Sequence, residues 1–210
     1  MKSPRRRAPQ FELTGGVLCL DFVNTLDNRP SGEPKELLAS YMDLARFGED
    51  TGTLSPGEAD RLFERSRTAP EEAARSLRAA VEMREAMYAV FRAIMRKQTA
   101  PAPALATLNR YVQDAAQHSG LVWSHGRFEW RCEESSSFDA VLWPIARSAA
   151  NLLASEQVGF VRACSSKTCQ WLFLDTSKNH RRRWCSMKLC GNRTKVRRFY
   201  ERKQWLVDSG

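Results

Sequence analysis

The sequence contains no apolar run near the ~20 residues that a bilayer-spanning helix needs. The apolar run at residues 17–23 is short and is interrupted by Asp21, and it follows a basic start, which is not the pattern of a secretory signal peptide. Catalytic motifs are also missing: we find no phosphate-binding glycine loop, nucleophile elbow or His-Glu metal motif. We therefore expect a cytoplasmic protein that makes no membrane contact and is not an enzyme.

Positive charge is concentrated at one end of the chain. Residues 160–210 contain 13 Lys/Arg and 3 Asp/Glu, a net charge of +10, whereas the other 159 residues contain 20 and 21, a net charge of −1. A strongly basic segment beside a near-neutral one indicates an acidic partner for the basic segment, and nucleic acid is the usual one.

Four of the six cysteines lie in this basic segment, where a cytosolic chain is not expected to form disulfides. Their spacing is Cys164-x4-Cys169, fifteen intervening residues, then Cys185-x4-Cys190. Two thiol pairs brought together by such an insert suit tetrahedral Zn²⁺, so we predict one structural zinc per chain. Because four cysteines leave no position for water or substrate, the pattern disfavours zinc catalysis.

Other interpretations of these residues stay open. Chance clustering of reduced thiols, a redox role and an iron–sulfur cluster would each use cysteine, and His180 lies five residues before Cys185 as a rival ligand. We interpret His180 as a turn residue, and Cys19 and Cys132 as buried free thiols that pack as small hydrophobes.

Hydrophobic periodicity predicts a predominantly helical α+β domain over residues 11–157, after a basic tail at residues 1–10. Ser40 is the predicted N-cap of a helix that ends at Gly48, and Ser55 with Glu58 resembles a capping box for the next helix. The remaining expected elements are a strand at 11–13, a strand or helix start at 17–22, helices at 69–97, about 105–115 and 138–155, a hairpin at 121–132, and a strand at 158–163.

Residues 158–210 are predicted to form the zinc module. Residues 171–174 are β-prone, residues 175–179 favour a turn, and residues 181–184 return toward the second cysteine pair. With a helix beginning near Cys190, this order predicts a knuckle, a hairpin and a helix, which is a treble-clef-like finger.

Known families share several of these segments. Residues 185–193, with the sequence Cys-Ser-Met-Lys-Leu-Cys-Gly-Asn-Arg, resemble the signature of the CGNR zinc-finger family, and residues 172–177 and 182–184 are also similar to it. Residues 15–25 and 84–88 resemble the ABATE domain that accompanies this finger. The resemblance implies a bacterial, stress-induced transcription regulator that binds nucleic acid.

Basic residues of the hairpin and the C-terminal helix are the predicted phosphate contacts. Asn192 and Arg193 lie two and three residues after the ligand Cys190, so we expect them to hydrogen-bond the ligand loop, with the reading of base edges as the alternative. Val196, Phe199 and Tyr200 are expected to form the apolar face of the helix. The predicted nucleic-acid contacts are Lys178, Arg181, Arg182, Arg183, Arg193, Lys195, Arg197, Arg198 and Arg202.

Together these patterns predict a zinc-dependent transcription regulator whose finger binds nucleic acid, with DNA as the expected partner. The N-terminal domain is expected to sense an unknown small-molecule effector or to mediate assembly, for example as a homodimer. An RNA-associated protein, a protein-interaction module and an enzyme with a site in the helical domain are the alternatives. Asp21, Asn24 and Asp27 are interpreted as capping or turn residues rather than as a ligand-binding loop.

Overall fold

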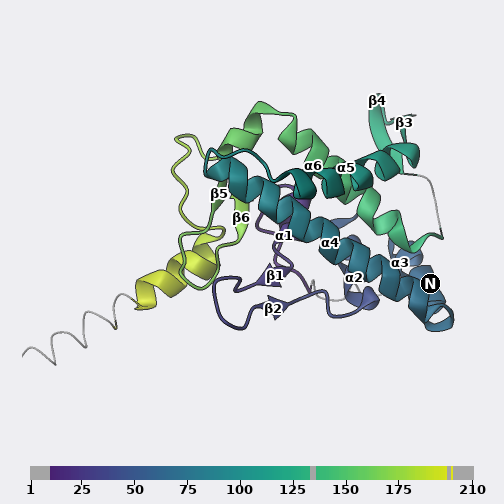
Figure 1. The fold of residues 1–210 in the computed structure, drawn as a ribbon, viewed down its shortest axis with the longest axis horizontal. Helices are drawn as coiled ribbons and strands as arrows, with labels where there is room; N and C mark the ends of the chain where they lie inside the picture. The colour runs from purple at the N-terminus through teal and green to yellow at the C-terminus, as the bar shows by residue number, and fades with distance from the viewer. Residues whose placement is uncertain (1–9, 133–135, 198–199, 201–210) are drawn as a thin grey trace, which may run out of the picture.

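The computed structural model of this chain describes residues 10–132, 136–197 and 200. Within them the fold is α+β and predominantly helical, as predicted, and the strands pair into antiparallel two-stranded sheets (Figure 1). The predicted tail falls outside the described residues except for Gln10. The elements, in chain order, are α1 (Leu18–Val23), β1 (Leu26–Asp27), β2 (Lys35–Glu36), α2 (Tyr41–Thr51), α3 (Pro56–Thr68), α4 (Pro70–Met95), α5 (Ala102–Gln117), β3 (Ser119–Ser124), β4 (Arg127–Cys132), the 3-10 helix η1 (Phe138–Val141), α6 (Leu142–Leu153), the 3-10 helix η2 (Glu156–Phe160), β5 (Val161–Ala163), β6 (Leu172–Leu174) and the π-helical turn η3 (Met187–Gly191).

Local capping chemistry starts α2 and α3 where the sequence predicts. Ser40 and Ser55 each accept a hydrogen bond from the backbone three residues on, and the carboxylate at that position bonds back to the cap. The predicted end of α2 at Gly48 is wrong, because the helix continues to Thr51 and stops at Gly52, whose φ of 73° is left-handed. Gly48 instead permits close packing, since a Cβ there would lie 2.8 Å from Leu54 Cδ1.

Helix α4 is the centre of the main core and packs against α1, α2, α3, α5 and α6. Its Met83, Met87 and Phe91 are fully buried, together with Phe22 of α1 and Phe47 of α2. Such burial of large apolar side chains supplies most of the stability of a helical domain. Among the described residues, no helix combines the length and the apolar character required to span a membrane.

For the first 25 residues, the structure corrects one prediction and decides another that was left open. Residues 11–13 form no strand; instead, Phe11 packs edge-on against Phe47, and its N–H donates to Asp50 Oδ2 at 3.2 Å. Residues 18–23 are helical, which settles the choice left open between strand and helix. A single short apolar run carries too little periodicity to make that choice from sequence.

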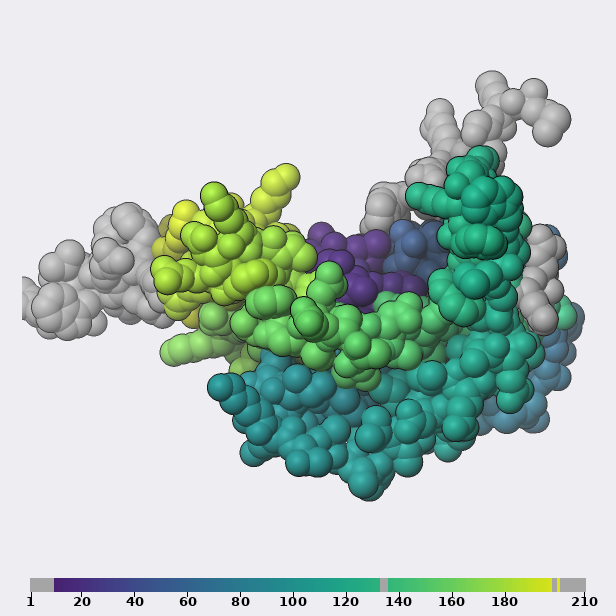
Figure 2. Space-filling view, turned by 90° about the horizontal axis from the view of Figure 1, so that it is seen from above, coloured from purple at the N-terminus to yellow at the C-terminus, as the bar shows by residue number. Residues whose placement is uncertain are grey.

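The predicted β3–β4 hairpin is confirmed, with the two-residue turn His125-Gly126 in the left-handed region (φ 49° and 80°). Its register pairs Leu121 with Trp130 and Trp123 with Phe128, which places all four side chains on one face of the sheet. These side chains are 54–68% exposed. Figure 2 shows the hairpin rising from the body beside α6, with a hollow between it and the zinc module.

The strand predicted at 158–163 is shorter than expected, because residues 156–160 form η2 and only Val161–Ala163 form β5. β5 pairs with β6 in the register Val161↔Leu174. Val161, Leu172 and Leu174 belong to the main core, whereas Phe173 packs with the four clustered cysteines. The residues on either side of the predicted boundary at 157/158 therefore share one continuous core.

Candidate metal centre and basic surface

The first cysteine pair sits in the loop that joins β5 to β6. Cys164 directly follows β5, and its N–H bonds to Trp171 O at 2.8 Å, which closes the hairpin around the loop. Cys169 N–H bonds back to Ser166 O at 3.2 Å, and Trp171 N–H points at Cys169 Sγ at 3.5 Å. Gln170, with φ 55°, makes the sharp turn between the two. Backbone amides directed at a ligand sulfur are typical of a zinc knuckle.

The second pair flanks the turn that starts the C-terminal helix. Ser186 caps this turn by accepting from Leu189 N–H at 3.3 Å, and Cys190 N–H bonds to Ser186 O at 3.0 Å. Helical backbone continues through residues 192–197. Cys190 therefore lies at the beginning of a helix, as in a treble clef, where the positive end of the helix dipole favours a thiolate.

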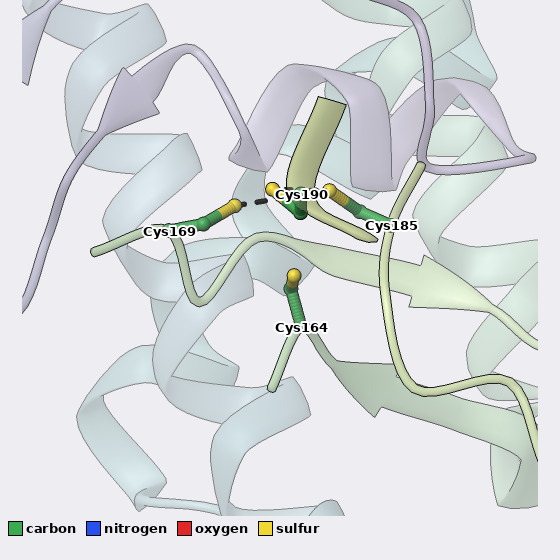
Figure 3. A group of neighbouring side chains, drawn as sticks. All are labelled: Cys164, Cys169, Cys185 and Cys190. Carbon is green, nitrogen blue, oxygen red and sulfur yellow. Dashed lines mark hydrogen bonds between the residues drawn. The ribbon is translucent and has the colours of Figure 1, made fainter. Parts of the chain in front are cut away.

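The four cysteine sulfurs converge on one point (Figure 3). All four side chains are buried and their sulfurs lie within 4.8 Å of one another. The Cys169–Cys185 and Cys185–Cys190 sulfur separations are both 3.7 Å. A tetrahedron with Zn–S bonds of about 2.3 Å has edges of ~3.8 Å. The four-cysteine cluster thus fits one structural zinc ion with no open coordination position.

Electrostatics of the cluster also calls for a cation. Hydrogen bonds from the Cys169 and Cys185 thiols lower the pKa of Cys164, while the same bonds raise the pKa of Cys169 and Cys185. Burial raises the pKa of Cys190. Four crowded, buried sulfurs cannot all carry negative charge unaided, whereas a dication in their midst lets all four ionise.

The insert between the cysteine pairs does not form the predicted hairpin. Residues 181–184 are not a strand, because β6 pairs with β5 on one edge and bonds Asn24 and Gly15 on the other. Instead the buried Asp175 organises the loop: its carboxylate accepts from Ser177 N–H at 3.0 Å, from Ser177 Oγ at 2.6 Å and from Arg182 N–H at 2.9 Å. Burial opposes the charge of Asp175, but these hydrogen bonds hold its pKa below the usual range.

His180, the rival ligand, takes part in the same loop. Its Nδ1 lies 2.8 Å from Asp175 O, its ring stacks on Phe160 at 3.9 Å between centroids, and its φ is 47°. Among the described residues, the candidate metal ligands at this site are the four cysteines, and His180 is not one of them. His180 is a turn residue in this structure.

Arg182 is placed differently from the other predicted nucleic-acid contacts. Its Nε donates to Trp184 O at 2.8 Å, a second nitrogen donates to Cys185 O, and the guanidinium lies 4.5 Å from the centre of the Phe173 ring. The half-buried side chain also approaches Thr14 O at 3.5 Å. Arg182 therefore fastens the ligand loop to the rest of the chain and is not available to a phosphate.

The remaining predicted contacts lie on the loop before Cys185 and on the helix after Cys190. Lys178, Arg181, Arg183, Arg193 and Lys195 are exposed, and Arg197 is half-buried. Arg198 and Arg202 lie outside the described residues.

The helix after Cys190 differs in two ways from its prediction. Asn192 and Arg193 are exposed, and the Asn192 N–H donates to Leu189 O and Met187 O of the ligand loop, but in the part of the chain that the structure describes neither side chain forms a hydrogen bond to that loop. Arg182 makes that contact in their place. The expected apolar face is not covered, since Val196 and Tyr200 are 55% and 63% exposed; Phe199 lies outside the described residues.

The polar residues after α1 have structural partners. Asp21 Oδ1 accepts from Gly15 N–H at 2.7 Å, and Asp27 Oδ1 accepts from Asn28 N–H at 2.7 Å. Asn24 is buried, and its amide bonds both the N–H and the C=O of Leu172 on β6. The first two fit the predicted turn and capping roles, whereas the tie from Asn24 to the zinc module has no local sequence signal.

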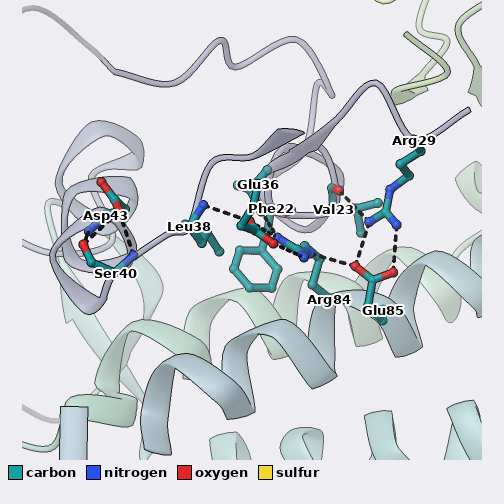
Figure 4. A network of polar contacts seen from close by, with 10 residues as sticks. Phe22, Val23, Arg29, Glu36, Leu38, Ser40, Asp43, Arg84 and Glu85 are labelled. Atoms are coloured by element: carbon teal, nitrogen blue, oxygen red, sulfur yellow. Dashed lines mark hydrogen bonds and ion pairs between the residues drawn. The ribbon is translucent and has the colours of Figure 1, made fainter. Parts of the chain in front are cut away.

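An ion network around the buried Arg84 is the other polar cluster of the N-terminal domain (Figure 4). Arg84 of α4, 2% exposed, reaches Glu36 through two hydrogen bonds of 2.6 and 2.7 Å and also contacts Glu85 at 2.9 Å. Arg29 bonds Glu85 at 2.7 Å and lies 4.0 Å from the centre of the Tyr88 ring. The charges are satisfied within the chain, so the network holds the β1–β2 segment on α4 and offers no open catalytic group.

Comparison with protein families agrees with this architecture. Residues 16–156 match the model of the ABATE family, whose description is "Putative stress-induced transcription regulator". The chain belongs to the ABATE family. Residues 161–203 match the CGNR zinc finger, so this ABATE protein carries the two domains in the order that the sequence indicates. A search of curated proteins finds no match.

Proposed function

We propose that this ABATE protein is a DNA-binding transcription regulator in which the zinc module contacts phosphates and the N-terminal domain senses a ligand or mediates assembly. The observation that carries the proposal is the set of exposed basic side chains on a metal-stabilised module. Lys178, Arg181, Arg183, Arg193 and Lys195 all lie within seven residues of a cysteine of the cluster and are exposed. Since the rest of the chain has a net charge of −1, attraction to a polyanion acts at this module.

Zinc has a supporting role in this proposal. Zinc fixes the loop of Arg181 and Arg183 and the helix of Arg193 and Lys195 relative to each other. The loop comes after the first cysteine pair in the chain and the helix comes after the second, and the metal joins the two pairs. A saturated cysteine site contributes no catalysis, and we propose that the protein is not an enzyme.

A titration of duplex DNA by fluorescence anisotropy at several salt concentrations tests the proposal. We expect Arg181→Gln with Arg183→Gln to weaken binding and to reduce the slope of log K against log salt by about 2, one phosphate contact for each arginine. Arg75→Gln with Arg78→Gln removes the same charge from exposed positions of α4 and is the matched control. No binding at low salt, or equal loss in both double variants, would contradict the proposal.

RNA is the second candidate, because Tyr200 is exposed on the basic helix and aromatic rings stack on unpaired bases. Competition between duplex DNA and a structured RNA of equal length separates the two. We expect duplex DNA to displace the labelled probe at the lower concentration, and the reverse order would assign the surface to RNA.

A further inference from the structure

A groove lies between the hairpin and the helical body, away from the metal centre. Its volume is about 970 Å³, within the range of sites for small organic ligands. Helix α6 forms one wall, the start of α1 with residues 52–58 forms another, and the end of β4 forms the third. Figure 2 looks into this hollow, with α6 in front of α1 and the hairpin beside them.

Arg147 of α6 gives the groove its chemistry. The half-buried guanidinium donates to two neutral groups, Ser119 Oγ at 3.1 Å and Cys132 Sγ at 3.6 Å. It also lies 5.4 Å from the centre of the Trp130 ring. No carboxylate pairs with Arg147 among the residues that the structure describes, in contrast to Arg84 and Arg29. A partly desolvated cation with neutral partners attracts an anion, and its planar fork suits a carboxylate.

The rest of the lining restricts that anion. Val17, Leu18 and Leu54 provide apolar wall, and Trp130, 54% exposed, offers an aromatic face next to the guanidinium. Glu58 also lines the groove, and hydrogen bonds from Ser55 lower its pKa, so it carries negative charge at neutral pH. This charge disfavours polyanions such as polyphosphates.

We propose that the groove binds a small organic acid with one carboxylate on an aromatic or apolar ring, the carboxylate facing Arg147 and the ring facing Trp130. Neither family description assigns a ligand to this place. The binding of the acid does not depend on what the zinc module binds.

The groove is also connected to the zinc module through the six-residue helix α1. Ser148, on the groove wall, accepts the N–H of Cys19 in the first turn of α1 at 3.1 Å. Just past the other end of the helix, Asn24 bonds Leu172 of β6, three residues after Cys169. A ligand that shifts α1 changes the support of the metal-binding hairpin. This second step, regulation of the finger by the acid, rests on the proposed function.

Calorimetric titration of the zinc-loaded full chain with 2-naphthoate, compared with its neutral amide 2-naphthamide, tests the site. We expect the amide to bind at least tenfold more weakly, the effect of one charge-assisted hydrogen bond. Arg147→Met removes the cation and should lower the naphthoate affinity by a similar factor, whereas Arg78→Met on exposed α4 should not.

Asn151→Trp is a second test of the site that does not depend on the folding of Arg147→Met. Asn151 is exposed on α6 and lines the groove, so a large ring there fills it. We expect it to abolish naphthoate binding with an unchanged melting temperature. The site is rejected if 2-naphthoate does not bind at millimolar concentration, if the acid and the amide bind equally, or if both groove variants bind like wild type.

Hydrogen exchange at the Leu172 and Leu174 amides tests the connection. Saturating 2-naphthoate should change their exchange rates at least threefold in wild type, whereas Asn24→Ala, which lies outside the groove and breaks the bond to Leu172, should bind the acid but lose this change. Unchanged rates at saturation reject the connection and leave the site standing. A protein that binds the acid and changes its exchange at β6, yet binds no nucleic acid, rejects the proposed function instead.

Discussion

Asn24 pairs with Leu172 as one strand pairs with another. Its Oδ1 accepts the Leu172 N–H at 2.8 Å and its Nδ2 donates to the Leu172 C=O at 2.9 Å. Strand β6 pairs with β5 on its other edge, and the next outward amide, that of Leu174, bonds Gly15 O at 2.8 Å. The segment around α1 therefore covers an open strand edge that would otherwise carry unpaired backbone groups.

Asn24→Ala should lower the free energy of unfolding by about 2–4 kcal/mol, because it removes two buried hydrogen bonds and leaves two backbone groups of Leu172 unpaired. Urea denaturation of the zinc-loaded protein measures this loss. Asn109→Ala, at an exposed position of α5, should change the free energy by less than about 0.5 kcal/mol. A loss of similar size in both variants would mean that the Asn24–Leu172 pair does not hold the two domains together.

Local signals in the sequence account for much of the fold. The capping boxes at Ser40 and Ser55, the His125-Gly126 turn and the spacing of the four cysteines each involve residues close in the chain, and each was predictable. These features depend only on residues near each other in the chain, so the local sequence pattern is enough to predict them.

Contacts between distant residues could not be predicted in this way. Asn24 and Leu172 are 148 residues apart, and nothing beside either one indicates the other. The three arginines 181–183 look alike in sequence, yet Arg182 alone turns inward to Trp184 O and Cys185 O. Similarly, Arg84 lies on the core side of α4, where periodicity predicts an apolar residue. Its burial is possible because Glu36, distant in the sequence, pairs with the guanidinium.

Removal of one ligand should empty the metal site. We expect about one zinc per chain in purified wild type and well below one in Cys190→Ser, because a hydroxyl is a poor replacement for a thiolate at a soft-metal site. Since Leu172 and Leu174 belong to the main core, chelation should also lower the melting temperature of the whole chain.

Cys132→Ser is the matched control for the metal measurement, because Cys132 is a free thiol outside the cluster. It should keep one zinc by elemental analysis. Full zinc retention in Cys190→Ser would contradict the assignment of the ligands.

The ion network on α4 predicts unequal effects of two similar substitutions. Glu36→Gln leaves the 2%-exposed Arg84 with a weaker partner and should cost about 2–3 kcal/mol, less than for a fully buried pair because Glu36 is 35% exposed. Glu82→Gln breaks the pair with Arg110, 61% exposed, and should cost clearly less than Glu36→Gln because solvent screens this pair. Chemical denaturation near neutral pH compares the two, and equal costs would argue against the network as the anchor of the β1–β2 segment.

Asp21 should give the stability an unusual pH dependence. Burial raises its pKa from 3.8 to about 6, so the folded chain holds this proton more tightly than the unfolded chain does. The stabilisation is therefore greatest at low pH and is lost as the pH rises from about 4 to 6.

Asn at position 21 keeps an oxygen for the Gly15 N–H but has no charge to bury. Relative to wild type, Asp21→Asn should gain roughly 1 kcal/mol in the free energy of unfolding between pH 5 and pH 7. Asp60→Asn, at an exposed site on α3, controls for the loss of one carboxylate, and urea titrations at each pH measure all three proteins. If the free energies of unfolding of wild type and Asp21→Asn changed with pH in parallel, burial of the Asp21 carboxylate would carry no free-energy cost in the folded state.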